Sequence, residues 1–361
     1  MANGATITQF GLRLKDGIKP LTGVTAESVH IREAANEASV WSFVISSNQF
    51  SAFNESYRDF MLGETPRVNV RLGMNSGGAT TWQPWQEHIV TRLKSVPKID
   101  ANTILMQTAD RFAESDRSTR TAAWQGKVSD IARRIAGLMD LEPVVEDTEG
   151  DYSLIQSFCS DYDFLIRLAS RAVNKSGSAN YRVFVRDREL HFHTIAFKAR
   201  ETIQLEGFFA PSTSVVISDD TQLQVHTGSA GAKLYTFNPF NGEVSIVKST
   251  EAKQKLAKAS PPVHKIPGGS LNLGFTIGQN RTEANDIAQA SYESARHGNY
   301  VVSLRTEGRV VHVDDKISLN VGQATAQPSP WSGFYVVSSA VHDIQQGTVH
   351  SKVVATRGDI N

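Results

Sequence analysis

Two histidines two positions apart are the first residues in this sequence that could bind a metal. His191 and His193 lie in the segment YRVFVRDRELHFH, where alternating apolar residues predict a β-hairpin with its turn at Asp187. Residues i and i+2 of a strand share one face, so the two imidazoles could hold a zinc ion together. The sequence offers no third ligand nearby, and the polarity of an exposed strand explains the pair more simply. We therefore expect no metal site.

A further histidine, His342, is followed directly by Asp343 in the segment SSAVHDI. A histidine oriented by a carboxylate is a common general base. Neighbouring residues of a strand point to opposite faces, however, so the two side chains do not meet if the segment is extended. The pattern favours a structural or interface histidine.

Other residues that could do chemistry have simpler interpretations. Cys159 precedes a predicted helix start, where the pKa of a thiol can be lowered, but no histidine partner follows, and we expect it to be inert. Asp161 and Asp163 are too close along one helix to flank a sugar as a glycosidase pair, and helix capping accounts for both. Trp82 and Trp85 could stack on a ligand ring, but two aromatic residues in a Pro-containing loop more often anchor that loop.

The known short motifs of catalysis are missing. The sequence contains no phosphate-binding Walker loop, no dinucleotide-binding glycine motif, no zinc-protease motif and no nucleophile elbow. We therefore predict no catalytic, cofactor-binding or metal-binding residues and no cofactor. The sequence indicates a binding or assembly protein and not an enzyme.

The clearest local signal lies in residues 156–171, QSFCSDYDFLIRLASR. Ser160 is placed to cap a helix, and Asp163 follows at its third position, an arrangement that satisfies backbone N–H groups at a helix start. The apolar residues after the cap recur at helical spacing and predict one buried face: Phe164, Leu165, Leu168, Ala169 and Ala172. A second helix is predicted over 127–141, with Ser129 as its cap.

Composition is that of an ordinary globular protein. The chain has 361 residues, of which 40% are hydrophobic and 20% are charged, and its formal net charge is zero. Bulk charge therefore gives no reason to expect binding to nucleic acid or to an anionic membrane. A single cysteine excludes an intramolecular disulfide. The sequence shows no signal peptide and no apolar run long enough to span a membrane, so we expect synthesis in the cytoplasm.

The order of elements indicates two β-rich ends around a mixed middle. Residues 6–112 read as short strands, with one or two helical turns at 54–62, and 116–200 read as α+β. Strands resume near 202, and a helix is predicted over 282–296 after a charged, Pro/Gly-rich segment at 248–269. The last strands are predicted at 300–304, 309–313, 316–319, 333–341 and 350–355. The two ends of the chain share a pattern of short predicted strands, which suggests two β-barrels that flank the middle.

The pieces in this order resemble the phage baseplate or tail hub family, which includes late control protein D of contractile phages and the hub part of VgrG proteins. The helix before the signal segment, the hairpin after it and the terminal segment GFYVVSSAVHDIQQGTVHSKVVATR with its His342 are similar to the family's pieces. Residues 248–278 match no family pattern. The residues that match the family's Q-x-x-x-S-D-x-x-F-L-x-R-L-A pattern are Gln156, Ser160, Asp161, Phe164, Leu165, Arg167, Leu168 and Ala169.

The resemblance implies a β-rich α+β fold, with two tube-protein-like β-barrels flanking an α+β middle domain. The implied first barrel is 1–115, the middle domain is 116–200 joined by 246–298, and the second barrel is 201–245 with 299–361. The matched residues and His342 are expected to have structural roles, with the apolar ones buried.

The resemblance also implies a function. Such hubs are homotrimers that adapt the hexameric tail tube to the trimeric central spike in the baseplate of a virion tail. Expected partners are the tube protein, the spike protein, the tape measure protein and surrounding baseplate proteins, with no specific binding of nucleic acid. The alternatives are the hub of a type VI secretion or tailocin-like injection machine and, from another class, a cell-wall hydrolase.

Overall fold

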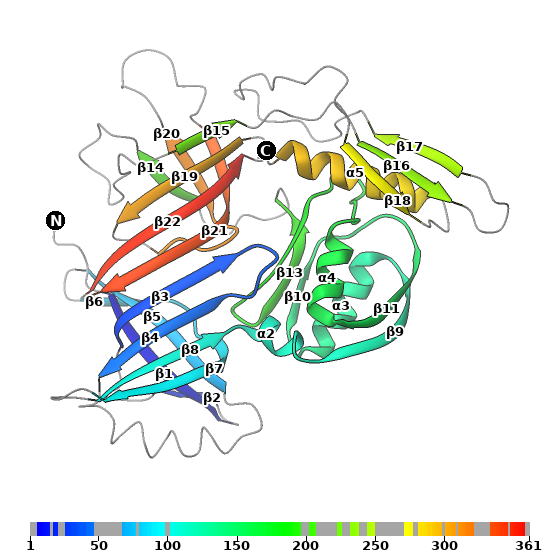
Figure 1. Cartoon of the computed structure of the whole chain (residues 1–361). Helices are drawn as coiled ribbons and strands as arrows, with labels where there is room; N and C mark the ends of the chain where they lie inside the picture. Colours follow the sequence, from blue (N-terminus) through cyan, green and yellow to red (C-terminus); the bar gives the residue numbers. More distant parts are fainter. Residues whose placement is uncertain are drawn as a thin grey trace, which may run out of the picture.

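One long β-sheet connects the two ends of the chain (Figure 1). In this computed structural model the described residues are 6–14, 17–20, 26–46, 67–76, 79–97, 102–195, 202–206, 222–225, 232–237, 244–249, 271–276, 281–297, 300–307, 310–320, 333–345 and 347–357. The strands of the N-terminal part are β1 (Thr6–Leu14), β2 (Gly17–Pro20), β3 (Ala26–Ala34), β4 (Val40–Ser46), β5 (Arg67–Ser76), β6 (Ala79–Trp82), β7 (Gln86–Pro97) and β8 (Asn102–Ala109). Those of the C-terminal part are β14 (Thr202–Glu206), β15 (Gln222–Val225), β19 (Tyr300–Glu307), β20 (Lys316–Asn320), β21 (Gly333–Gln345) and β22 (Thr348–Arg357).

The described strands of the long sheet contain the same arrangement twice. In the first unit the neighbours run β1-β5-β7-β8-β4-β3, and in the second they run β14-β20-β21-β22-β19-β15. Each strand of one unit has a counterpart at the same place in chain order in the other. The difference is that β14 lies parallel to β20, whereas β1 is antiparallel to β5. The similar pattern of strands at the two ends of the sequence therefore corresponds to two units with the same strand order.

The two units join edge to edge. β21 of the second unit pairs with β3 of the first over seven residue pairs, from Ser339 with Ala34 to Gln345 with Ser28. One apolar core lies in the first unit and also includes Val310, Ile344 and Val349 of the C-terminal part, and a second core lies within the second unit. The cores follow from strict alternation, because Val29 on β3 faces inward while its neighbour His30 faces solvent.

A mixed layer lies at one end of the first unit's strands (Figure 1). Its elements are α2 (Arg111–Ser115), β9 (Thr119–Gly126), α3 (Val128–Leu138), β10 (Glu142–Val145), β11 (Tyr152–Ser160), α4 (Asp161–Ala169), β12 (Tyr181–Arg186) and β13 (Glu189–Thr194). β9 and β11 form a two-stranded ribbon, and β10, β13 and β12 form a three-stranded sheet. Helices α3 and α4 bury their apolar faces in one core with these strands.

The predicted hairpin and both helices of this layer are confirmed. The hairpin turns at Asp187 and Arg188, whose φ angles of +52° and +67° fit a two-residue turn that matches the twist of the strands. The prediction that Ser129 caps α3 is wrong. Lys127 occupies the cap position without a side-chain bond, and the Oγ1 atom of Thr148 accepts from the backbone N–H of Ser129 at 3.0 Å.

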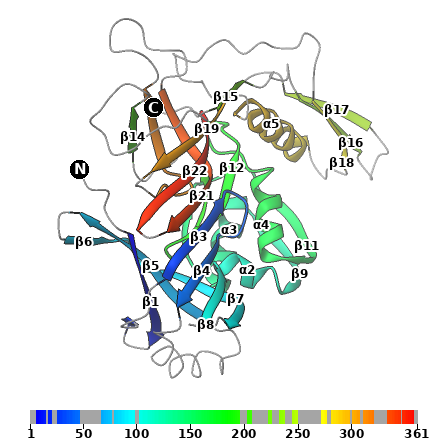
Figure 2. The same ribbon diagram turned by 60° about the vertical axis from the view of Figure 1, so that its left-hand side comes forward.

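A small unit is inserted between β15 and β19 (Figure 2). It consists of β16 (Ala232–Phe237), β17 (Val244–Ser249), β18 (Leu271–Thr276) and α5 (Arg281–His297). Ala290 of α5 packs with Val173 and Ala179 of the mixed layer, and the Tyr152 hydroxyl donates to the carboxylate of Asp286. The insertion therefore rests on the mixed layer.

The structure confirms some predictions about the fold and contradicts others. The fold class, β-rich α+β, is confirmed. The strand predicted at 309–313 is wrong, because residues 310–313 form an irregular segment. The range 201–245 includes β16, which pairs with β17 and β18 and not with the second unit. The segment 54–62 and the segment 250–269 lie outside the described residues, and the division into domains stays a prediction.

We expect Phe164→Ala or Leu168→Ala to lower the free energy of unfolding by about 2–5 kcal/mol, because both side chains are buried in the core of the mixed layer. Denaturant titration followed by circular dichroism measures this. Arg167→Ala on the exposed face of α4 is the control and should change stability by about 0.5 kcal/mol or less. Equal losses in core and control variants would contradict the placement of the helix.

Candidate functional site

The matched segment builds a side-chain clamp at the end of the ribbon. Gln156 on β11 is fully buried. Its amide oxygen accepts from the indole N–H of Trp124 at 3.0 Å, and its amide nitrogen donates to the carbonyl of Cys159 at 3.1 Å and to Asp161 Oδ1 at 2.8 Å. Every hydrogen-bonding group of a buried amide needs a partner, so this glutamine fixes the chain between β11 and α4.

Helix α4 begins at this clamp as predicted. Ser160 Oγ accepts from the backbone N–H of Asp163 at 3.0 Å, which confirms the cap. Asp161 Oδ2 pairs with the guanidinium of Arg120 at 3.1 Å. The matched apolar residues are buried, whereas Arg167 is exposed. The structure therefore brings Gln156, Ser160 and Asp161 together.

His342, the remaining signature residue, lies elsewhere. It sits on β21 in the long sheet and is fully buried. Its Nδ1 atom is 2.6 Å from Ser351 Oγ, and its Nε2 atom is 2.8 Å from the carbonyl oxygen of Val311. Asp343 points to the opposite, exposed face and pairs with His30 at 2.6 Å. The two neighbours do not meet, as strand alternation predicts, and the structural role of His342 stays a prediction.

A buried ion pair joins the two sheet units. His312 Nδ1, in the segment between β19 and β20, lies 3.1 Å from both carboxylate oxygens of Glu33 on β3. Burial opposes ionisation of Glu33, but His312, with His342 and Arg186 behind it, outweighs burial and lowers the pKa of the carboxyl to about 2. Burial likewise opposes the charge on His312, and Glu33 reverses this and raises its pKa.

Two arginines of β12 attach the mixed layer to the same place. Arg186 Nη1 pairs with Asp315 Oδ1 at 3.0 Å. Arg182 is buried and donates to the carbonyl of Val337 and to Thr356 Oγ1, each at 2.8 Å. Three parts of the chain therefore meet at one polar centre, which we call the junction: Glu33, Arg182, Arg186, His312 and Asp315.

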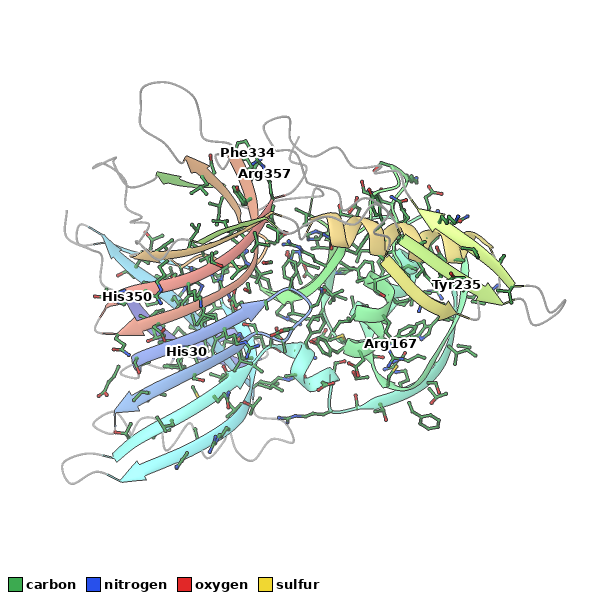
Figure 3. All side chains as sticks on the ribbon, turned by 45° about the horizontal axis from the view of Figure 1, so that its top comes forward. His30, Arg167, Tyr235, Phe334, His350 and Arg357 are labelled. Atoms are coloured by element: carbon green, nitrogen blue, oxygen red, sulfur yellow. The ribbon has the colours of Figure 1, made fainter. Side chains whose placement is uncertain are left out.

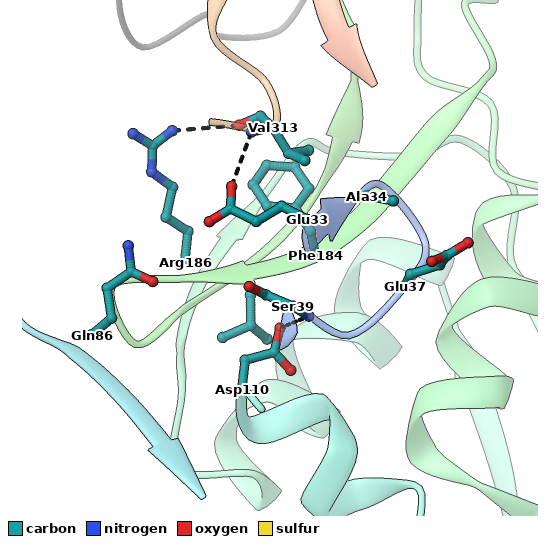
Figure 4. Close-up of a pocket in the computed structure, with 10 residues that line it drawn as sticks. Glu33, Ala34, Glu37, Ser39, Gln86, Asp110, Phe184, Arg186 and Val313 are labelled. Atoms are coloured by element: carbon teal, nitrogen blue, oxygen red, sulfur yellow. Dashed lines mark hydrogen bonds between the residues drawn. The ribbon is translucent and has the colours of Figure 1, made fainter. Parts of the chain in front are cut away.

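A cavity of about 20 Å³ lies beside the junction (Figure 4). Glu33, Gln86, Asp110 and Arg186 line it, and Val313 closes one side. This volume and these polar groups suit one water molecule and no larger ligand. Burial raises the pKa of Asp110 to about 7, although backbone N–H groups donate to both of its carboxylate oxygens.

The long sheet presents a polar face to solvent. One row of cross-strand neighbours crosses six strands: Arg92, Gln107, Ser42, His30, Asp343 and His350. Figure 3 shows His30 and His350 on this face, and a groove of about 390 Å³ runs over it beside Arg92, Lys94 and Leu105. Because side chains alternate between the two faces of each strand, the same face of the sheet is exposed to solvent in both units.

The remaining candidates pack against other side chains of the fold. The guanidinium of Arg71 lies over the rings of Trp82 and Trp85, at 4.5 and 4.4 Å from their centroids, a contact that fits the predicted anchoring of their loop. The prediction that His191 and His193 are exposed is wrong, because they are only 2% and 1% exposed. Among the described residues, no group of three ligating side chains is arranged to hold a metal.

Sequence reasoning missed the junction. The burial of Glu33 could have been predicted from the sequence. It follows Val29 and Ile31 at alternate positions of β3, and these positions face the core. An acid in that register must be paired when it is buried. Its partner His312 gave no such signal, since it lies 279 residues away in an irregular segment.

We expect His342 to make folding sensitive to acid. Burial lowers its pKa from 6.5 to about 4, so the stability it contributes is present above pH 6.5 and is lost as the pH falls through about 4. The difference is on the order of 3 kcal/mol. Thermal or denaturant unfolding of His342→Gln from pH 7 to 4 should show a shallower decline than wild type. His30→Gln, on the exposed face, should keep the wild-type decline, and parallel curves for all three proteins would contradict this.

The fold of the chain is similar to that of known proteins, although its sequence is not. No protein-family model and no curated protein sequence matches the chain. A tail protein from Neisseria meningitidis superposes with a TM-score of 0.62 at 9% identity, covering 98% of this chain and 97% of that chain. An Escherichia coli type VI secretion component, described as similar to the T4 tail proteins gp27 and gp5, gives 0.54 at 10% identity over 94% and 74%. The Francisella PdpA–VgrG complex gives 0.55 at 9% identity over 98% and 53%.

No helix among the described residues is both long and apolar enough to cross a membrane. The similarity covers nearly all of this chain and of the Neisseria tail protein, about three quarters of the secretion component and about half of the chain from the VgrG complex. The chain therefore has the fold that phage tail proteins share with the VgrG proteins of injection machines, as its sequence resemblance predicted.

Proposed function

We propose that this chain is the structural hub of a contractile phage tail baseplate, without enzymatic activity of its own. In this role three copies form a ring that joins a hexameric tail tube to a trimeric central spike. The tape measure protein and neighbouring baseplate proteins are further partners, and the protein resides in the tail of the virion. The fold of tail and VgrG proteins supports this role.

The duplicated sheet is the observation that carries the proposal. One chain contributes two units of the same strand order within one sheet. Three chains around a three-fold axis then offer six similar units, which match a six-fold tube because closed rings need repeated, equivalent contact surfaces. Pairing of β21 with β3 sets the spacing between units within a chain.

The rest of the chain supplies the other symmetry. The mixed layer and the inserted unit occur once per chain, so a trimer presents three of each. A surface that repeats three times suits a trimeric spike. The chain therefore combines six-fold and three-fold surfaces without any change of conformation between copies.

The polar sheet face fits the inside of such a ring. Its residues alternate with the buried cores of the two units, so it stays free when the cores are complete. Sheet edges left open in one chain would pair with those of the next, which removes exposed edges. The row from Arg92 to His350 would then line a central channel.

A second candidate is the hub of a type VI secretion or tailocin-like machine. The similarity to a type VI secretion component and to a VgrG complex favours it, and the fold is shared. A cell-wall hydrolase is less well supported. The buried acids of the junction, Glu33 and Asp315, are held in ion pairs and do not face one another across an open cleft.

We expect the purified chain to form a stable trimer with a mass three times 39.5 kDa at micromolar concentration. Sedimentation velocity measures the mass, and negative-stain images should show a ring with a central channel. Averaged images of intact particles should place that ring between tube and spike. A monomer at these concentrations, together with particles that lack the ring, would contradict the proposal.

A further inference from the structure

Strands β7 and β21 are built in the same way, residue for residue. The first four residues of β7 pair with β5, as the first four of β21 pair with β20. A bulge follows in each strand, between Val90 and Arg92 in β7 and between Val337 and Ser339 in β21. Each residue of β21 therefore lies 247 positions after its counterpart in β7, since 337 follows 90 and 339 follows 92 by that number.

The halves of these two strands beyond the bulge differ in what pairs with them. Residues 339–345 of β21 pair with β3 on one side and with β22 on the other, and this is the join between the two units. The equivalent half of β7, residues 92–97, pairs among the described strands with β8 alone. Its other edge offers backbone N–H and C=O groups for a further strand. The join within the chain shows what kind of strand that edge accepts.

The counterpart of β3 in the second unit is β15. Ile31 of β3 pairs with Trp41 on β4, and Leu223 of β15 pairs with Val302 on β19, in both cases antiparallel. Trp41 and Val302 occupy equivalent places opposite β8 and β22. Leu223 is therefore the counterpart of Ile31. Among the described strands, β15 pairs with β19 only and ends the long sheet.

The sequence of β15 keeps the pattern that β3 uses at the join. It reads QLQV over residues 222–225, with polar and apolar residues in alternation. The counterparts of these residues on β3 are exposed and buried in the same alternation: His30, Ile31, Arg32 and Glu33. A strand with this pattern suits a position with one face toward a core and one toward solvent. The difference is that β15 has Val225 where β3 has its buried acid.

We propose that β15 of one copy pairs with residues 92–97 of β7 of the next copy, antiparallel and in the register in which β3 pairs with β21. Val225 then lies opposite Leu93, and Gln224 lies opposite Lys94. The pairing rests on the proposed trimer and names the strands that hold it together. A ring of three chains then contains six joins of one kind, three within chains and three between them, as a closed ring of equivalent units requires.

The chemistry at the centre of the join changes between the two cases. Within the chain, Glu33 lies opposite the small Ala340, and its carboxylate is paired with His312. Between copies, two branched apolar residues, Leu93 and Val225, take these places. Leu93 is already half-buried against the core of the first unit, so the new strand extends that core. Apolar cross-strand pairs stabilise a sheet, and the join between copies therefore needs no buried ion pair.

A disulfide tests the register directly. Lys94→Cys with Gln224→Cys is made in the full chain, whose native Cys159 is buried, and the purified trimer is oxidised and run on a denaturing gel without reductant. We expect a covalent trimer, because directly opposed residues of antiparallel strands lie within disulfide range. β15 and β7 lie at opposite ends of the sheet within one chain (Figure 1), so this bond forms only between copies.

Two further pairs are the controls. Arg32→Cys with Val341→Cys is the equivalent pair at the join within the chain, and it should close inside one copy and leave a monomer on the gel. Arg92→Cys with Gln222→Cys is four residues out of register in the proposed pairing, about 13 Å apart, and should give no covalent product. Equal crosslinking of this pair and of the Lys94 and Gln224 pair would overturn the register.

Hydrogen exchange of the wild-type protein tests the join without substitution. Peptides that contain residues 92–97 and 222–225 should have amides that exchange about tenfold or more slowly in the trimer than after dilution to monomer, because their free edges become hydrogen-bonded. Peptides from β3, at the join within the chain, should exchange alike in both states. Unchanged exchange at 92–97 would contradict the pairing.

These results separate the pairing from the proposed function. A wild-type protein that is monomeric at micromolar concentration refutes the trimer and this join with it. A wild-type trimer in which the Arg32 and Val341 pair closes but the Lys94 and Gln224 pair does not refutes the join alone, and the hub role then stands on other contacts between copies.

Discussion

The buried pair of Glu33 and His312 is the interaction on which the arrangement of this chain depends. A carboxylate taken out of water must be paired and hydrogen-bonded, or it takes up a proton. Glu33 is paired only when the second unit lies against β3, and His312 is oriented only when Asp315 accepts from its backbone N–H. The charge therefore favours one relative position of the two units over sliding of their edges.

The same centre fixes the mixed layer. Arg186 pairs with Asp315, and Arg182 reaches two groups of the β21–β22 hairpin. If β12 moved away, the buried Asp315 carboxylate and the Val337 carbonyl would lose these partners. Breaking one partner of such a group costs more than the group contributes when complete, so the contacts act together. The sheet can thus serve as a rigid arc, and the mixed layer keeps a defined place at its end.

Local features of the fold could be predicted from the sequence, whereas long-range pairings could not. The cap at Ser160, the buried face of α4 and the hairpin turn at Asp187 depend on neighbours within a few residues, and they were correct. Exposure of His191 was predicted wrongly because strand alternation assumes one wet face, and this strand is covered on both. The junction depends on Glu33 and His312, which lie 279 positions apart, and no sequence periodicity reports such a pairing.

Structures that share this fold at 9–10% identity show how little of the sequence the architecture requires. Alternating apolar residues suffice to form each strand, because burial is non-directional and tolerates exchange. Hydrogen bonds, which need a particular group in a particular direction, constrain the sequence at a few places, such as the amide of Gln156. That residue satisfies three separate groups and could not be replaced by an apolar side chain without leaving them unpaired. A motif that reads as a helix cap is therefore better understood as the fastening of the β-bulge between Gln156 and Cys159, and the helix begins where it does because the bulge ends there.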